Sequence, residues 1–169
     1  MPVIDRHAQI VDDTWRYHES STSSGLYANA VLSLDELVAL GSESPALRPL
    51  GVVAPAGTTA EQLSPYLDRL DLVVVEFPKF RDGRGFTLAR TLRNKHEFKG
   101  DIRASGHILP DQFTALVQCG ISSILLPTDH PVEQWTQSLP MPSPSSTKGP
   151  LLQRLLREKA AAICKSEAT

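Results

Sequence analysis

Short apolar segments alternate with amphipathic ones over most of the chain. The clearest apolar run is LVVVEF at residues 72–77, which is rich in β-branched residues and is typical of a buried parallel strand. Further strands are predicted at 30–32, 51–54, 102–105 and 121–126. Amphipathic helices are predicted between them at 34–40, 59–70, 85–97 and 111–119. Strands that alternate with helices in this way favour a parallel α/β sheet with right-handed crossovers.

About five strands are expected in the alternating part, too few for a closed eight-stranded barrel, so we expect an open sheet or a half-barrel-like layer. The two ends of the chain differ from this alternating region. Residues 3–13 predict an N-terminal β-hairpin. We therefore divide the chain into a single α/β domain (1–139), a Pro/Ser-rich linker (140–150), and a C-terminal amphipathic helix and tail (151–169). That helix packs either on its own sheet or on another protein.

Composition narrows the class of protein. The chain has 169 residues, of which 41% are hydrophobic and 21% charged, and these values exclude a disordered chain. The net charge of −2 argues against nucleic-acid binding, and no apolar run is long enough to span a membrane. No secretory leader is recognised at the start, so a cytoplasmic protein is expected. Cys119 and Cys164 form no CxxC motif, so neither a metal site nor a dithiol is expected, and the cofactor stays open.

The strongest chemical signal lies where the strand at 72–77 leads into the next helix. The candidate residues of this bend are Lys79, Arg81, Asp82, Gly83, Arg84 and Gly85. Ligands of open α/β sheets bind at the carboxyl ends of the strands, and glycines let the backbone approach a ligand closely. Cations beside a helix N-terminus suit an oxyanion, a phosphate or an acidic protein surface. The alternative is a tight structural turn in which Asp82, a plausible N-cap, pairs with an arginine.

The charge distribution supports the same region. Residues 76–103 hold eight Lys and Arg against four acids, a net charge of +4, whereas the rest of the chain carries −6. Basic charge is therefore concentrated in one segment although the total is close to zero. The plainer interpretation of Arg90, Arg93, Lys95 and Lys99 is an ordinary solvated helix face.

The next strand edge adds a second group of candidates. These residues are Arg103, Gly106, His107, Asp111 and Gln112. If consecutive strands are neighbours, Arg103 and His107 approach the same crevice as Arg84. His107 is able to act as an acid or base near neutral pH, although a loop histidine is more often only solvated. The sequence contains no complete dinucleotide fingerprint and no recognisable nucleophilic triad, so catalytic residues stay unassigned. Asp12 and Asp13 are interpreted as part of a turn.

Several of these motifs occur together, and in this order, in a known family. The chain resembles the proteobacterial domain-of-unknown-function family 934 over roughly residues 3–135. The residues that carry the resemblance are Asp12-Asp13, Trp15, 51–55, Phe77-Pro78, Phe80, Asp82 to Gly85, Ala89, Leu92-Arg93, 100–104, Gly106, Asp111-Gln112 and Cys119-Gly120. The chain departs from the family pattern at Thr87, where serine is usual, and at His107, where Asp or Asn is usual.

The resemblance also implies a function. Members of this family are typically encoded next to the haem-containing sulfite reductase and are labelled probable oxidoreductases of sulfite reduction. Together with the basic bend, it implies an accessory protein of assimilatory sulfite reduction. Such a protein would assist sulfite reductase or dock on it through that bend, or help bring electrons or the sulfite anion to it. Two alternatives remain. One is an oxidoreductase or other enzyme that binds a small oxyanion or a phosphate-bearing cofactor at the bend, and the other is a non-catalytic scaffold that docks through its C-terminal helix. A second copy of the chain is a further candidate partner.

Overall fold

The computed structural model describes residues 1–17, 28–41 and 48–137. All of them belong to one compact unit, Met1–Leu139. The predicted linker and C-terminal helix fall in the other unit, Pro140–Thr169, and lie outside the described residues.

The described chain is built on one eight-stranded sheet with the order β2-β1-β8-β7-β6-β5-β4-β3. The strands are β1 (Val3–Asp5), β2 (Ile10–Val11), β3 (Arg16–Tyr17), β4 (Ala30–Ser33), β5 (Leu50–Ala54), β6 (Leu72–Phe77), β7 (Asp101–Gly106) and β8 (Ser123–Leu125). Strands β3 to β8 run parallel, and β1 and β2 form an antiparallel hairpin beside β8. The predicted hairpin and parallel α/β sheet are confirmed. The additional strand is β3, whose two residues are too short to show a pattern.

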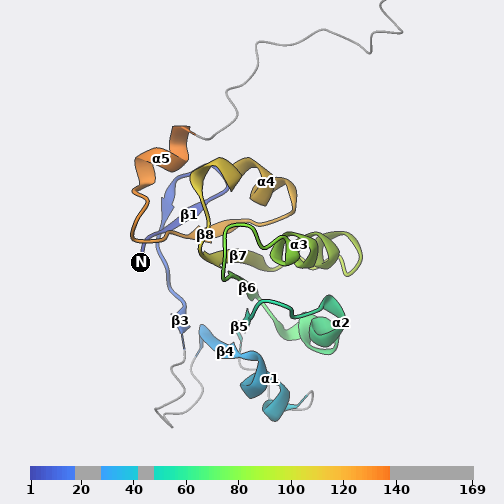
Figure 1. The fold of residues 1–169 in the computed structure, drawn as a ribbon. Coiled ribbons are helices and arrows are strands. Elements are labelled where there is room, and N and C mark those ends of the chain that lie inside the picture. The colour runs from blue at the N-terminus through green and yellow to red at the C-terminus, as the bar shows by residue number, and fades with distance from the viewer. Residues whose placement is uncertain (18–27, 42–47, 138–169) are drawn as a thin grey trace, which may run out of the picture. The chain divides into compact units, whose positions relative to one another are not determined.

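Helices follow strands β4 to β8 along the chain. They are α1 (Leu34–Leu40), α2 (Ala60–Leu63), the 3₁₀ helix η1 (Ser64–Arg69), α3 (Arg84–Asn94), the 3₁₀ helix η2 (Pro110–Gln112), α4 (Phe113–Gln118) and α5 (Val132–Gln137). Helices α1 to α4 lie on one face of the sheet (Figure 1). The single helix predicted at 59–70 is divided into α2 and η1, because Pro65 has no N–H to continue the α-helical ladder.

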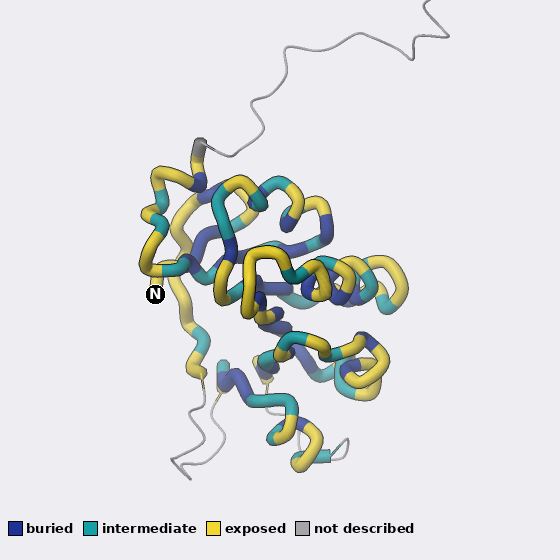
Figure 2. The backbone as a smooth tube through the Cα atoms, in the orientation of Figure 1, coloured by how far each residue is buried: buried dark blue, intermediate teal, exposed yellow. Residues whose placement is uncertain are grey.

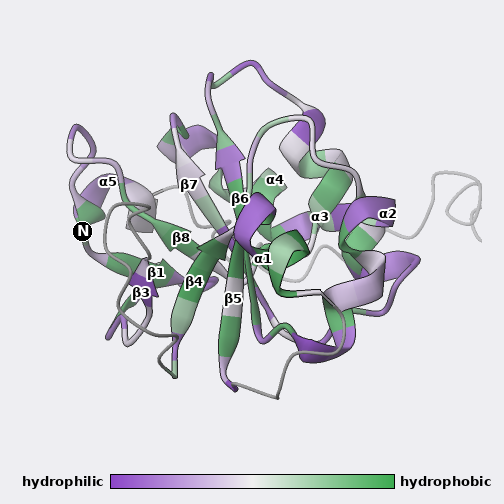
Figure 3. Ribbon diagram, turned by 90° about the horizontal axis from the view of Figure 1, so that it is seen from below, coloured by the Kyte–Doolittle hydropathy of each residue, from purple (hydrophilic) through white to green (hydrophobic). Residues whose placement is uncertain are grey.

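Alternation along the strands separates two cores, and most of the strand residues are hydrophobic (Figure 3). Val73, Val75 and Phe77 of β6 belong to the main cluster, which also contains buried side chains of α1, α3 and α4. On the opposite face Leu72 and Val74 form a second, smaller cluster with Trp15 packed against it. Buried residues accordingly line the strands and the inner sides of the helices, whereas the connecting loops are mostly exposed (Figure 2).

The sheet is strongly curled, and chain connectivity shows why. Strands β2 and β3 are the two edges of the sheet, seven strand spacings apart, which a flat sheet would set about 34 Å from each other. Only residues 12–15 join them, and the five residue steps from Val11 to Arg16 span at most about 18 Å. The edges must therefore approach each other, giving a half-barrel. We call residues 12–15 the strap; it passes on the side of the sheet away from α1 to α4 (Figure 1).

Candidate functional site

The bend between β6 and α3 is a hydrogen-bonded turn. The Asp82 N–H donates to the Lys79 carbonyl over 3.0 Å, which places Phe80 and Arg81 at the tip. The Gln112 Nε2 group of η2 donates to the Phe80 carbonyl over 2.7 Å. The tip is thereby tethered to the neighbouring crossover, and we call residues 79–82 the anchored turn.

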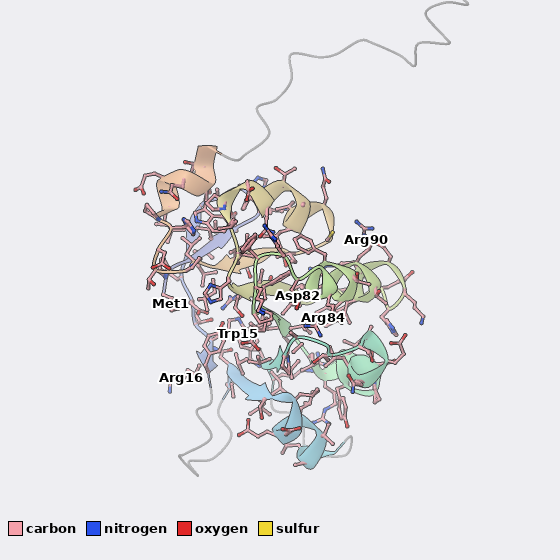
Figure 4. All side chains as sticks on the ribbon, in the orientation of Figure 1. Met1, Trp15, Arg16, Asp82, Arg84 and Arg90 are labelled. Atoms are coloured by element: carbon pink, nitrogen blue, oxygen red, sulfur yellow. The ribbon has the colours of Figure 1, made fainter. Side chains whose placement is uncertain are left out.

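Asp82 and Arg84 form an ion pair at the start of α3 (Figure 4). Arg84 donates from Nε to Oδ1 over 2.9 Å and from Nη2 to Oδ2 over 2.6 Å. The Arg84 hydrogen bonds hold the pKa of Asp82 down to about 2, and the Asp82 carboxylate raises the pKa of Arg84. The position before the helix is Gly83, with no side-chain cap, while Asp82 accepts the backbone N–H of Arg84. Most of the charge of Arg84 is therefore balanced within the turn.

The two glycines of the bend have different surroundings. Gly85 is buried, and a Cβ at this position would lie 2.5 Å from the Phe77 Cζ atom, so the missing side chain lets α3 pack closely on β6. Gly83 has an ordinary φ of −76°, and nothing lies within 4 Å of the place its Cβ would take. Gly85 thus serves packing, and its buried backbone is not offered to a ligand.

The carboxyl end of β7 lies directly beside this bend. The His107 N–H donates to the Phe77 carbonyl over 2.7 Å. Gly106 has a φ of +98°, and a Cβ there would lie 2.4 Å from the Phe77 carbonyl oxygen, so this close approach requires glycine. His107 and Asp111, which follow β7 in the chain, are exposed, and Gln112 is hydrogen-bonded to the anchored turn. The structure therefore brings the end of β7 and η2 together with the bend.

Arg103 is not brought to that crevice. Because side chains alternate along β7, Arg103 lies on the sheet face away from the helices, where it is only 3% exposed. Its Nη1 atom donates to the Asp13 carboxylate over 2.8 Å and to the Tyr17 hydroxyl over 3.1 Å. Its Nε atom donates to Ser123 Oγ over 3.2 Å, and Asp101 lies 3.7 Å from Nη2. Arg103 thus ties the strap and β3 to the middle of the sheet.

The ionisation of this cluster follows from its burial. Burial acts to lower the pKa of Arg103, but the hydrogen bonds with Asp13 and Tyr17 reverse this effect, so the pKa lies above its usual value. Partial removal from water has the opposite effect on Tyr17, whose pKa it raises. Sequence reasoning missed Asp13 and Tyr17 as partners of Arg103. The available signal was the spacing of Asp13, Trp15 and Tyr17 at every second residue, which directs all three side chains to one face of an extended segment.

The other cations of the basic segment divide into bound and exposed ones. Arg93 does not belong to a solvated face, because its guanidinium donates to the carbonyls of Phe98, Gly100 and Gly120 at 2.6–2.8 Å, and burial lowers its pKa. Lys95 forms a surface ion pair with Glu61 at 3.0 Å. Lys79 and Arg81 are exposed, and neither has an ion pair within the described residues. These two cations remain accessible to a partner.

A cavity of about 360 Å³ lies between α2 and α3, next to the bend. Its lining residues are Gly57, Thr58, Thr59, Ala60, Glu61, Arg84, Thr87, Leu88 and Thr91. Arg84 uses its Nε and Nη2 atoms to bind Asp82. Its Nη1 atom lies 3.4 Å from the position that a Cβ of Gly57 would take. One guanidinium edge and several hydroxyl groups therefore border this cavity.

The part of the chain that the structure describes contains no cluster of three or more His, Cys, Asp or Glu side chains placed to hold a metal ion. In the same residues no helix is long and apolar enough to cross a membrane.

These features define a half-barrel α/β protein with helices on one face and a tethered, cationic turn at the carboxyl end of its central strand. The model of the family described as "Bacterial protein of unknown function (DUF934)" matches residues 51–143, which is more than half of the chain. The protein therefore belongs to this family, as the resemblance predicted. The match begins at β5 and includes the anchored turn, whereas β1 to β4 precede it. No curated protein matches the chain.

Proposed function

We propose that this protein is an accessory component of assimilatory sulfite reduction that docks on sulfite reductase through the anchored turn. The family resemblance supplies the partner, because it implies genes encoded beside the haem-containing sulfite reductase. The structure supplies a surface that suits docking. The same proposal assigns the protein to the cytoplasm.

One observation carries this proposal: Lys79 and Arg81 project from a turn whose backbone is held in place before any partner binds. The turn closes on its own hydrogen bond, and Gln112 fixes its tip. A preorganised surface loses little conformational entropy on binding, and exposed cations accelerate association with an acidic partner. Arg84 contributes less, because Asp82 already neutralises it.

The proposal is tested first in the cell. Deletion of the gene is expected to impair growth on sulfate or sulfite and to spare growth on cysteine. Complementation with the intact gene restores growth, and complementation with an Arg81→Glu, Lys79→Glu variant does not. Normal growth of the deletion strain on all three sulfur sources would contradict the proposal.

A second candidate function is favoured by the cavity beside Arg84. An enzyme that binds a small oxyanion or a phosphate-bearing cofactor would use the Arg84 Nη1 atom and the threonine hydroxyls that line this space. Calorimetric titration of the purified protein with sulfite, flavin mononucleotide or a nicotinamide dinucleotide tests it. This candidate requires saturable binding that is lost in Arg84→Ala, and the absence of heat with all three ligands rejects it.

A further inference from the structure

The anchored turn also presents an aromatic ring to solvent. Phe80 is 46% exposed, although large apolar side chains are usually withdrawn from water. The other large exposed hydrophobic side chains of the described residues are Met1, Ile10, Val11, Tyr17 and Val38, which lie at the chain start, on the short edge strands or on α1. Phe80 differs from them because it occupies the tip of a turn between two exposed cations.

The ring is held in a defined position. The peptide on one side of Phe80 belongs to the Lys79–Asp82 turn, and its own carbonyl accepts the Gln112 hydrogen bond. The Arg81 guanidinium stacks over the ring with its Cζ atom 5.2 Å from the ring centroid. Such a cation–π contact restricts both side chains without removing the positive charge from the surface. The ring and the guanidinium therefore form one composite surface.

The charged residues next to Phe80 along the chain are both cations. Lys79 and Arg81 flank Phe80 directly, while the nearest carboxylate along the turn, Asp82, is bound by Arg84. A partner surface that matches this pattern offers an apolar recess rimmed by carboxylates. Aromatic and arginine side chains are enriched at protein interfaces, where a few residues carry most of the binding energy.

We propose that Phe80 is the apolar anchor of the docking surface and that it inserts into a carboxylate-rimmed recess on a partner protein. This inference rests on the proposed function and goes further, because it names the residue that contributes most to binding and the chemistry of the surface that receives it. A small oxyanion would bind the cations without using the ring, so the exposed Phe80 favours a protein as the occupant.

Binding of the full-length protein to purified sulfite reductase, measured by fluorescence anisotropy, tests the inference. Phe80→Ala and Arg81→Ala are each expected to raise Kd by about tenfold or more. Val38→Ala truncates a residue of α1 that is 54% exposed, and Lys99→Ala removes an exposed cation beyond the other end of α3. These two matched controls are expected to keep Kd within about twofold. Thermal melts of all variants confirm that each one is folded.

The outcomes separate the two proposals. If the wild type binds and Phe80→Ala binds equally well, the anchor is overturned while the docking function stands. If the wild type does not bind sulfite reductase, the docking function fails, and photocrosslinking in cells then decides on the anchor. In that experiment, p-benzoylphenylalanine at position 80 must capture one protein, identified by mass spectrometry, and the same probe at position 38 must not. The Arg81→Glu substitution must also suppress the adduct. Equal capture at both positions, no capture, or Phe80-dependent binding to anionic phospholipid vesicles would overturn the anchor.

Discussion

The strap is the most testable structural feature of this protein, because one partly buried ion pair, between Asp13 and Arg103, holds it. Asp13→Ala removes the carboxylate that accepts the 2.8 Å hydrogen bond from Arg103, whose side chain is 4% exposed. Arg103 is then left with Asp101, at 3.7 Å, and with the hydroxyl groups of Tyr17 and Ser123. The substitution thus removes the only direct hydrogen bond to a carboxylate that Arg103 makes within the described residues.

The size of the effect follows from this geometry. Removing one partner of a buried ion pair costs about 3–5 kcal/mol when the remaining charge has no other partner. Losing a single hydrogen bond to a charged group costs about 1.5–3 kcal/mol. Because Asp101 continues to offset part of the Arg103 charge, we expect Asp13→Ala to lower the free energy of unfolding by about 2–3 kcal/mol.

Urea unfolding followed by circular dichroism measures this change. Asp12→Ala is the matched control, since Asp12 is an exposed carboxylate on the same strap, and it is expected to change stability by less than about 0.5 kcal/mol. If Asp13→Ala is as stable as Asp12→Ala, the strap is not held by Arg103 and the reasoning is refuted.

Three further predictions concern the bend and its surroundings. The carboxyl group of Asp82 should titrate near pH 2 by NMR, and its pKa should return toward the ordinary value of 3.8 in Arg84→Ala. Because folding lowers this pKa, the ion pair stabilises the protein above about pH 4, and this contribution disappears as the pH falls through about 2. Gly85→Ala should destabilise the protein by about 1–3 kcal/mol in chemical denaturation, whereas Gly83→Ala should change stability by less than about 1 kcal/mol; equal losses would contradict the packing role of the buried glycine. The buried thiol of Cys119 should react with a maleimide much more slowly in the native protein than in urea, as followed by peptide mass spectrometry; equal rates would show that the thiol is accessible.

Local patterns account for most of the predicted fold. The β-branched run of β6 and the amphipathic period of α3 are readable because each reflects one buried face of one element. Ser33 likewise predicts the start of α1, where its hydroxyl accepts the Glu36 N–H and the Glu36 carboxylate accepts the Ser33 N–H. Boundaries are less readable, and α3 begins one residue earlier and ends three residues earlier than expected.

The surroundings of the candidate residues were harder to predict, because the curl of the sheet and side-chain geometry determine them. Asp13 and Arg103 are 90 residues apart, and only the return of the strap across the sheet brings them together. The sequence pattern located the cationic bend, but it did not show that Gly85 fills a packing position under Phe77. It also did not distinguish the compensated Arg84 from the accessible Arg81, since pairing depends on side-chain geometry that composition does not contain.

The salt dependence of binding tests the docking account most directly. Titration of the full-length protein into purified sulfite reductase should yield a complex whose Kd rises by about tenfold or more between 50 and 300 mM NaCl, because the exposed cations of Lys79 and Arg81 contribute to association and salt screens them. A complete lack of association, or an affinity that does not change with salt, would contradict it.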